Sequence, residues 1–468
     1  MEYELVIQGG TLVSRERVEK LDIAVQGDKI AAIAPHLNGK TTYSAEGMLV
    51  IPGGVDPHVH IDMATPTTRT SDDWSSGTLA AAFGGTTTVI DFIEPEEDET
   101  LIQAYQKRRA EADGLAVIDY SLHMTLSRSE PELLTQVPEV VAAGMTSFKL
   151  YTTYAGLAQR DEGLIKCFDA VRQAGGLVLV HCENDAIIQA SIQRLSEAGK
   201  LHPSYYPDSR PPIAEIEAIR RVIALARFTG VPLYVVHIST GTGASAVARA
   251  RKFGQVVYGE TCPQYLILNE NAYRNPDGLE AVKYQCSPPI RQQKDHKIIW
   301  EMLGSGGIQT VGTDHCPFNI VGQKDKGKEN FLKSLGGVPG VEPRLALMYT
   351  YGVRAGNITA EQWVSACCTT PAEIFGLAPQ KGALAVGADA DIVLFDPEKK
   401  VTLTKALLHE RVDYTPYEGL QLTGYPRATF IRGRLLVEGG RLVNPQPDGR
   451  FLKRKGHQIP TARLTDEF

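Results

Sequence analysis

Two histidines separated by a single residue, His58 and His60, lie in the apolar run Ile51-Pro-Gly-Gly-Val-Asp-Pro-His-Val-His. On a β-strand, residues i and i+2 point to the same face, so both imidazoles can aim at one point while Val59 faces the opposite way. Neutral imidazole is a common metal ligand. The pair therefore suggests a metal site, but the same pattern also occurs where histidines only satisfy polar contacts, and other residues must decide.

The chain around this pair alternates short β-branched runs with amphipathic stretches, a pattern typical of βα repeats. Eight strands are predicted, at residues 49–60, 86–92, 117–124, 147–151, 177–181, 232–237, 256–262 and 308–314. Eight such strands favour an α/β fold in which a parallel sheet closes into a (β/α)8 barrel, which needs roughly 250 residues or more. We expect this TIM-like barrel to occupy residues 51–379.

The two ends of the chain differ from this pattern. Residues 1–50 and 380–443 contain short alternating strands with Gly-Gly and Gly-Asp turn signals. We expect them to pair into one small β-sandwich domain. Residues 444–468 are polar and proline-containing, so we expect a C-terminal arm whose basic patch, Phe451-Leu-Lys-Arg-Lys, is solvated.

Functional groups of a barrel collect at the carboxyl ends of its strands. Six ionisable side chains fall at such ends here, and their spacing fits whole βα units of roughly 31 residues, apart from a Pro-rich insertion before the last histidine. They are His58, His60, Lys149, His181, His237 and Asp314. Four histidines, one lysine and one aspartate are therefore predicted to surround one mouth of the barrel.

Lys149 is unusual because it lies between Phe148 and Leu150 on a short strand and so points inward. An unpaired buried ammonium is costly. One interpretation is a lysine that reaches solvent or a carboxylate at the barrel rim. The other is that the neutral amine adds carbon dioxide and becomes a carbamate whose two oxygens each hold one metal ion.

Composition excludes several classes of protein. The chain has 468 residues, 43% hydrophobic and 22% charged, with a net charge of -7, which is typical of a globular protein and offers no basic stripe for nucleic acid. The acidic start, with no apolar stretch of spanning length, predicts a cytoplasmic protein without a membrane partner. Seven irregularly spaced cysteines argue against a disulfide framework and favour structural thiols.

Eight motifs together make the chain resemble the dihydropyrimidinase and hydantoinase family of the amidohydrolase superfamily, from about residue 3 to residue 455. They are Gly54-Val-Asp-Pro-His-Val-His60, Ala82-Phe-Gly-Gly-Thr-Thr-Thr88, Ser147-Phe-Lys-Leu-Tyr151, Val180-His-Cys-Glu-Asn-Asp185, Val236-His-Ile-Ser239, Glu260-Thr-Cys-Pro-Gln-Tyr265, Ser287-Pro-Pro289 and Gly312-Thr-Asp-His-Cys-Pro317. The resemblance implies a (β/α)8 barrel with a β-sandwich, and a homotetramer.

The same resemblance implies two divalent metal ions, most often Zn²⁺, bridged by a carboxylated lysine and a hydroxide. The ligands of the buried ion would be His58, His60 and Asp314, those of the exposed ion His181 and His237, and the bridge Lys149 as N6-carboxylysine. A set of nitrogen and oxygen ligands without thiolate agrees with zinc, and manganese or cobalt can also be accommodated.

The implied reaction is hydrolysis of a cyclic amide, in which a 5-substituted hydantoin or a dihydropyrimidine ring opens to the N-carbamoyl amino acid. The bridging hydroxide would attack, with Asp314 as general base, and Tyr154 would donate to the oxyanion. Ser287 and Gly336 would bind the small-molecule substrate. Gly336 stands where the family usually has asparagine, but the contact there is mostly a main-chain carbonyl, so the function can survive with more backbone freedom.

Loops around the mouth resemble the family's gate over the substituent on the fifth ring carbon. Met63, Ile93 and Leu157 are the apolar candidates for shaping that pocket, and simple packing is the alternative.

Three other functions compete with this one. Allantoinase and dihydroorotase share the metal centre, but Tyr154 and the segment Val412-Asp-Tyr-Thr-Pro-Tyr-Glu-Gly419 favour the dihydropyrimidinase branch. A mononuclear deaminase of the superfamily would not need Lys149. A non-catalytic paralogue would have lost ligands, whereas all six positions are filled here.

Overall fold

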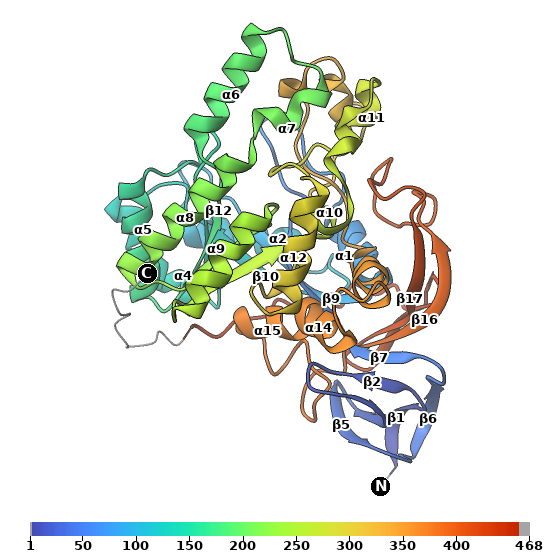
Figure 1. Cartoon of the computed structure of the whole chain (residues 1–468). Helices are drawn as coiled ribbons and strands as arrows, with labels where there is room; N and C mark the ends of the chain where they lie inside the picture. Colours follow the sequence, from blue (N-terminus) through green and yellow to red (C-terminus); the bar gives the residue numbers. More distant parts are fainter. Residues whose placement is uncertain (1, 458–468) are drawn as a thin grey trace.

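The computed structural model describes residues 2–457, and its largest element is an eight-stranded parallel sheet whose strands follow one another in chain order (Figure 1). The strands are β8 (Gly54–Val59), β9 (Thr86–Ile93), β10 (Asp119–Thr125), β11 (Ser147–Tyr151), β12 (Leu177–His181), β13 (Leu233–Val235), β14 (Val257–Thr261) and β15 (Thr310–Val311). A parallel bridge from Val59 to His315 joins the first strand to the segment after the last. The predicted barrel is confirmed.

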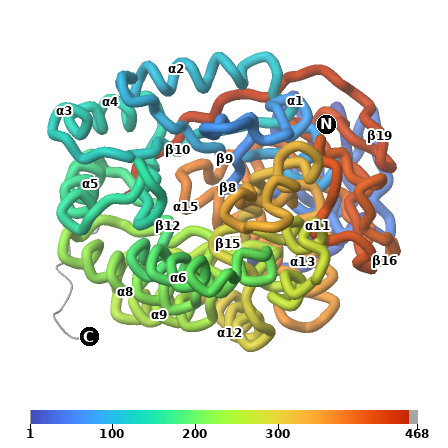
Figure 2. Tube along the Cα trace, turned by 90° about the horizontal axis from the view of Figure 1, so that it is seen from above, coloured from blue at the N-terminus to red at the C-terminus, as the bar shows by residue number. Residues whose placement is uncertain are grey.

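Helices surround this sheet as an outer ring, seen from above in Figure 2. The main ones are α1 (Trp74–Phe83), α2 (Leu101–Ala112), α4 (Val137–Ala142), α5 (Asp161–Gln173), α8 (Pro212–Thr229), α9 (Gly241–Lys252) and α12 (Gln293–Gly304). Capping boxes start two of them: Asp73 begins α1 and Thr100 begins α2, each satisfying backbone donors that a helix start leaves free. In α5, Leu164, Phe168 and Val171 recur at helical spacing and are buried, so this stripe faces the sheet.

The strands themselves are buried on both faces, as expected where helices cover a closed parallel sheet. In β12, Val178 and Val180 belong to the large outer core under the helices, whereas Leu177 and Leu179 belong to a core inside the barrel. His181 shares the inward orientation of Leu177 and Leu179. The apolar alternation of the strand therefore directs this histidine to the interior.

Further helices lie beyond the ring. The segments α6 (Asp185–Glu197), α7 (Tyr206–Ser209) and α11 (Gly278–Val282) stand above the barrel in Figure 1. Shorter helices complete the chain between the last barrel strand and the C-terminal strands; they include α13 (Arg344–Met348), α14 (Ala360–Val364) and α15 (Thr370–Ile374).

The prediction of one strand at residues 49–60 is wrong, because the chain forms two. β7 (Leu49–Pro52) pairs with β16 (Ile392–Thr402) in another sheet, and β8 starts the barrel. At Gly53 between them, a Cβ atom would lie 2.0 Å from Thr87 Oγ1, so only glycine allows so close a passage. The chain crosses from one sheet to the other at this residue.

Two further sheets form the predicted β-sandwich from both ends of the chain. One has the order β5-β4-β1-β6 and the other β19-β18-β17-β16-β7-β2-β3, in which the short strands are β2 (Thr11–Val13), β3 (Val18–Lys20) and β19 (Arg441–Leu442). Besides β7 and β16, their longer strands are β1 (Tyr3–Gln8), β4 (Asp22–Gln26), β5 (Lys29–Ala34), β6 (Gly39–Ser44), β17 (Gln421–Ile431) and β18 (Arg434–Glu438). Ile7, Ile23 and Ile392 share one buried cluster between the sheets. The exact domain limits stay a prediction: residues 1–50 with 380–443 for the sandwich, and residues 51–379 for the barrel.

The predicted solvated patch near the C-terminus is wrong for two of its residues. Leu452 is 7% exposed and belongs to the core inside the barrel, with its N–H donating to Tyr120 O at 2.7 Å. Arg454 is also buried and donates to Ser147 Oγ at 2.6 Å and to Leu122 O. This segment covers the amino-terminal end of the barrel. Residues 458–468 of the predicted arm lie outside the described residues.

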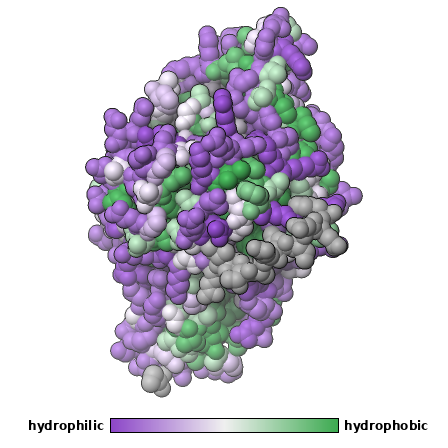
Figure 3. Space-filling model, turned by 90° about the vertical axis from the view of Figure 1, so that its left-hand side faces the viewer, coloured by the Kyte–Doolittle hydropathy of each residue, from purple (hydrophilic) through white to green (hydrophobic). Residues whose placement is uncertain are grey.

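The surface in Figure 3 is mostly hydrophilic, with smaller hydrophobic patches between the polar side chains. Such patches are common on water-exposed protein surfaces. Within residues 2–457, none of the helices combines the length and apolar character needed to cross a lipid bilayer.

We expect Leu452→Ala to destabilise the protein by about 2 to 4 kcal/mol, because it leaves a cavity inside the barrel. Lys453→Ala is the matched control, since that neighbouring side chain is exposed. Thermal unfolding followed by circular dichroism should show a lower midpoint for Leu452→Ala alone. Equal midpoints would mean that the segment only rests on the surface.

Candidate metal centre

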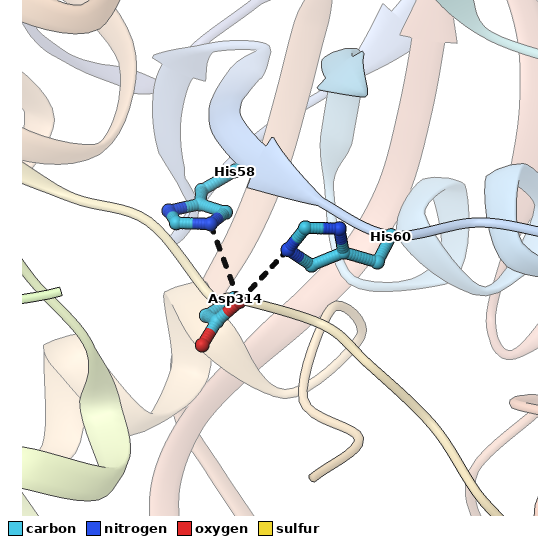
Figure 4. A group of neighbouring side chains, drawn as sticks. All are labelled: His58, His60 and Asp314. Carbon is cyan, nitrogen blue, oxygen red and sulfur yellow. Dashed lines mark ion pairs between the residues drawn. The ribbon is translucent and has the colours of Figure 1, made fainter. Parts of the chain in front are cut away.

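His58 and His60 converge on one carboxylate, as their spacing on a strand predicts. The Nε2 atoms of both rings lie 3.2 Å from Asp314 Oδ1, and the three side chains point toward one another (Figure 4). One ligand atom from each lies within 4.8 Å of the others, and all three residues are largely removed from water. His58 Nε2 is buried without a hydrogen-bond partner among the described residues. Such a group can hold a divalent metal ion.

Asp314 is held in a strained backbone conformation, with φ at 52°. The preceding residue is fixed to the buried Asp56, because Thr313 N and Thr313 Oγ1 donate to its carboxylate at 3.1 and 2.6 Å. Strain of this kind persists where surrounding contacts determine the conformation. Burial opposes ionisation of Asp314, but His58, His60 and Lys149 outweigh it and lower the pKa of the carboxyl group. The site therefore contains a carboxylate.

A second pair of histidines lies beside the first. His181 Nδ1 is 2.9 Å from His237 Nε2, and the rings of His237 and His58 are stacked with centroids 5.5 Å apart. His237 follows β13 with φ at 39°, another left-handed residue at this end of the barrel. Burial lowers the pKa of both imidazoles. They are therefore neutral near pH 7, which is the form that binds metals.

Lys149 lies between the two pairs on β11, and its residue is only 1% exposed. Its Nζ lies 5.0 Å from the ring centroid of Phe92, and none of the described residues forms an ion pair with it. The interpretation of a lysine that reaches solvent or a carboxylate at the rim does not fit this position. Burial lowers the pKa of Lys149 to about 8. More of its amine is therefore neutral, as reaction with carbon dioxide requires.

One cavity of about 720 Å³ connects all the predicted site residues. It is lined by His58, His60, Lys149, Tyr154, His181, His237, Ser287, Asp314 and Gly336. Met63 and Leu157 also line it, whereas Ile93 lines a smaller neighbouring cavity of about 310 Å³. The structure thus brings together residues predicted from distant segments, and their metal-binding and catalytic roles remain predictions.

The chain matches the model of the amidohydrolase family over residues 49–436. It is 40% identical to the D-hydantoinase of Geobacillus stearothermophilus over 453 residues, 96% of each chain. The chain belongs to the amidohydrolase family. Its relatives place it in the hydantoinase and dihydropyrimidinase branch, as the motifs predicted.

Two solved structures support the same assignment. The D-hydantoinase from a Bacillus sp. AR9 superposes with a TM-score of 0.95 at 39% identity, covering 97% of this chain and 100% of that one. The dihydropyrimidinase from Brevibacillus agri NCHU1002 has a TM-score of 0.95 at 40% identity, covering 97% and 99%. The barrel and sandwich of this amidohydrolase are therefore shared with these proteins.

Glu260 at the end of β14 is a site residue that we did not predict. Its Oε1 accepts from His58 Nδ1 at 2.7 Å and from His237 N at 3.0 Å, while Tyr234 donates to its Oε2 at 2.8 Å. With Nδ1 occupied as a donor, His58 presents Nε2 to Asp314. The sequence did contain a signal for this role, because Glu260 is an ionisable residue at the carboxyl end of the seventh predicted strand.

Glu183 and Arg210 form a second unpredicted pair. Glu183 Oε2 lies 2.8 Å from His181 Nε2 and also accepts from Arg210, whose guanidinium lies 5.2 Å from the Tyr154 ring centroid. Burial opposes ionisation of Glu183, but Arg210 and His181 outweigh it and lower its pKa. The carboxylate thus directs His181 Nδ1 toward His237. Glu183 could have been found two residues after His181, but the position of Arg210 in the Pro-rich insertion gave no signal.

We expect Glu260→Gln to weaken divalent metal binding about 10- to 100-fold, because a neutral amide oxygen accepts more weakly from His58 and the amide nitrogen cannot accept from Tyr234. Glu215→Gln is the matched control, since that buried carboxylate accepts from Ser239 and forms no hydrogen bond with a histidine among the described residues. Metal retained after dialysis against a chelator, measured by elemental analysis, should fall in Glu260→Gln only. Equal retention in both variants would contradict a supporting role for Glu260.

Proposed function

We propose that this amidohydrolase opens cyclic amides, namely 5-substituted hydantoins and dihydropyrimidines, to the N-carbamoyl amino acids. The observation that carries the proposal is the convergence of four histidines, one lysine and one aspartate on one cavity. Relatives with nearly full coverage are named D-hydantoinase and dihydropyrimidinase.

We further propose two divalent metal ions, with zinc as the best match to imidazole and carboxylate ligands without thiolate. The residues that would hold them are His58, His60 and Asp314 for the first ion, His181 and His237 for the second, and carboxylated Lys149 for both. Two observations support this assignment: His58 Nε2 faces Asp314 without a hydrogen bond from the described residues, and the buried Lys149 forms no ion pair with them. When bound, two such ions supply an activated water and polarise the amide carbonyl.

Asp314 would act as the general base. Its carboxylate faces the cavity between the histidine pairs, where it can accept a proton from the attacking water. The Asp314 carboxyl group can then deliver this proton to the ring nitrogen of the substrate as the amide bond breaks. The contacts of Thr313 with Asp56 that maintain the strained backbone at Asp314 also fix the position of its carboxylate.

Tyr154 would donate to the oxyanion that forms on the amide carbonyl. Its ring lies 5.0 Å from that of His181, and Ala158 N donates to its carbonyl at 2.9 Å, holding a backbone with φ at 80°. Burial raises the pKa of Tyr154 to about 12. The hydroxyl therefore keeps its proton near pH 7 and can donate it in a hydrogen bond.

Ser287 would bind the ring through its free main-chain carbonyl. On either side of it, Cys286 O accepts from Tyr206 at 2.9 Å and Pro288 O from Tyr265 at 2.8 Å, whereas no described residue donates to Ser287 O.

Gly336 would offer a second carbonyl, on a segment that lies beside Ser287: a Cβ atom at Gly336 would be 3.3 Å from Ser287 Oγ. Leu335 O and Gly337 O accept from Lys324, and no described residue donates to Gly336 O. Two free acceptors at one side of the cavity match the N–H donors of a cyclic imide or ureide.

We also propose a cytoplasmic homotetramer, supported by the family resemblance. Light scattering on the purified protein measures the assembly directly.

The purified enzyme should open dihydrouracil or racemic 5-substituted hydantoins, with N-carbamoyl products identified by chiral chromatography. Asp314→Asn is the negative control, since it removes the proposed base. Allantoin tests the nearest alternative. If the enzyme opened allantoin alone, it would be an allantoinase. If it opened none of these rings, the proposal would be overturned.

We expect Lys149→Ala to lose its metal ions and ring-opening activity, because the bridge between the ions disappears. Added acetate or propionate should restore part of the activity by providing a carboxylate in the vacated space. Lys166→Ala, at an exposed lysine of α5, controls for the loss of a charge. Unchanged metal content and turnover in Lys149→Ala would contradict the two-metal site.

A further inference from the structure

Lys324 is a buried cation that the reaction does not use. It begins the short 3-10 helix η3 (Lys324–Gly327) and is 0% exposed. No described carboxylate forms an ion pair with it, and its three acceptors are main-chain carbonyls at 2.9, 3.0 and 2.7 Å, those of Gln285, Leu335 and Gly337. A buried ammonium without a counter-ion is costly, so these hydrogen bonds must offset its desolvation.

The acceptors of Lys324 flank Ser287 and Gly336, two residues that line the cavity and whose carbonyls accept no hydrogen bond from the described residues. Gln285 precedes Ser287 by two residues, and Leu335 and Gly337 lie on either side of Gly336. Gly337 N also donates to Gln285 O at 2.9 Å, so the two segments are in direct contact. One ammonium group therefore ties together both sides of the proposed ring-binding clamp, which we define as residues 285–288 and 335–337.

The clamp needs such an anchor because its second half is rich in glycine. Gly337 has φ at 147°, and a Cβ atom there would lie 2.4 Å from Cys316 O, so no other residue fits. Adjacent glycines lose more conformational entropy on ordering than any other pair of residues. The three hydrogen bonds from Lys324 restrict this segment without placing a side chain in the cavity.

We propose that Lys324 is a positioning residue that fixes the carbonyls of Ser287 and Gly336 for recognition of the substrate ring. The proposal rests on the proposed function, since it assigns these carbonyls to ring binding. Lys324 contacts neither the histidines nor Asp314 through a hydrogen bond or ion pair. Its loss should therefore weaken ring binding in the ground state and the transition state alike, which raises KM and leaves kcat nearly unchanged.

The test is Lys324→Met, which keeps an unbranched side chain shorter by one atom but removes its donors. With 5-phenylhydantoin or dihydrouracil, whichever the unmodified enzyme opens, we expect KM to rise about tenfold, kcat to change less than threefold, and metal content to stay constant.

Lys381→Met is the matched control. Lys381 is equally buried, but it pairs with Asp119, Asp389 and Asp391 at 2.5 to 2.9 Å and does not line the cavity. We expect this variant to lower thermal stability without a change in KM. An unchanged KM in Lys324→Met, or a shift no larger than in Lys381→Met, would overturn the proposal.

If Lys324→Met does not fold, Lys324→Gln decides, since its side chain is one atom shorter and its two donors cannot satisfy all three carbonyls. A several-fold rise in KM in that variant supports the proposal, and an unchanged KM overturns it. Failure of the unmodified enzyme to open any cyclic amide would overturn both this proposal and the proposed function, whereas ring opening with an unaffected KM would overturn this one alone.

Discussion

The alternation of inward and outward side chains along the barrel strands is the constraint on which the site depends. In β11, Phe148 and Leu150 pack under the outer helices while Lys149 enters the cavity. A shift of one residue in the strand register would reverse these orientations and place an amine among apolar helices. The burial of Phe148 and Leu150 therefore holds Lys149 in the cavity. A substitution that weakened this packing would also change the geometry of the site.

Burial has a second consequence, because it makes the polar groups around the cavity depend on one another. Glu260 contacts His58 and Glu183 contacts His181, each through one ring nitrogen. The other nitrogen of each ring, His58 Nε2 and His181 Nδ1, is then directed toward Asp314 and His237. Since an unpaired buried charge is strongly unfavourable, removing either carboxylate would disturb more than one contact. The hydrogen bonds from Glu260 and Glu183 hold His58 and His181 in position, so the loops around the cavity need not fix these rings.

Much of this arrangement could be predicted from local patterns. The strand at 177–181 and the inward direction of Lys149 follow from apolar alternation, which is a property of adjacent residues. The break at Gly53 could not be seen, because it depends on pairing with β16 more than 300 residues later. The burial of Leu452 was missed because its neighbours are basic. Buried Leu452 and Arg454 nevertheless alternate with exposed Lys453 and Lys455, as in a half-buried strand. The hydrogen bonds of Lys324 depend on main-chain carbonyls 11 to 39 residues away, which carry no side-chain signal in the sequence.

The closure of the barrel by Leu452 also bears on the order in which the protein folds. Strands β2, β3 and β7 are synthesised early, yet their sheet needs β16 and β17, and the interior of the barrel needs a residue made later still. Contacts between such distant residues carry a large entropic cost of loop closure and slow folding. A nascent chain that already contains all the predicted metal ligands therefore still lacks Leu452, the residue that completes the core inside the barrel.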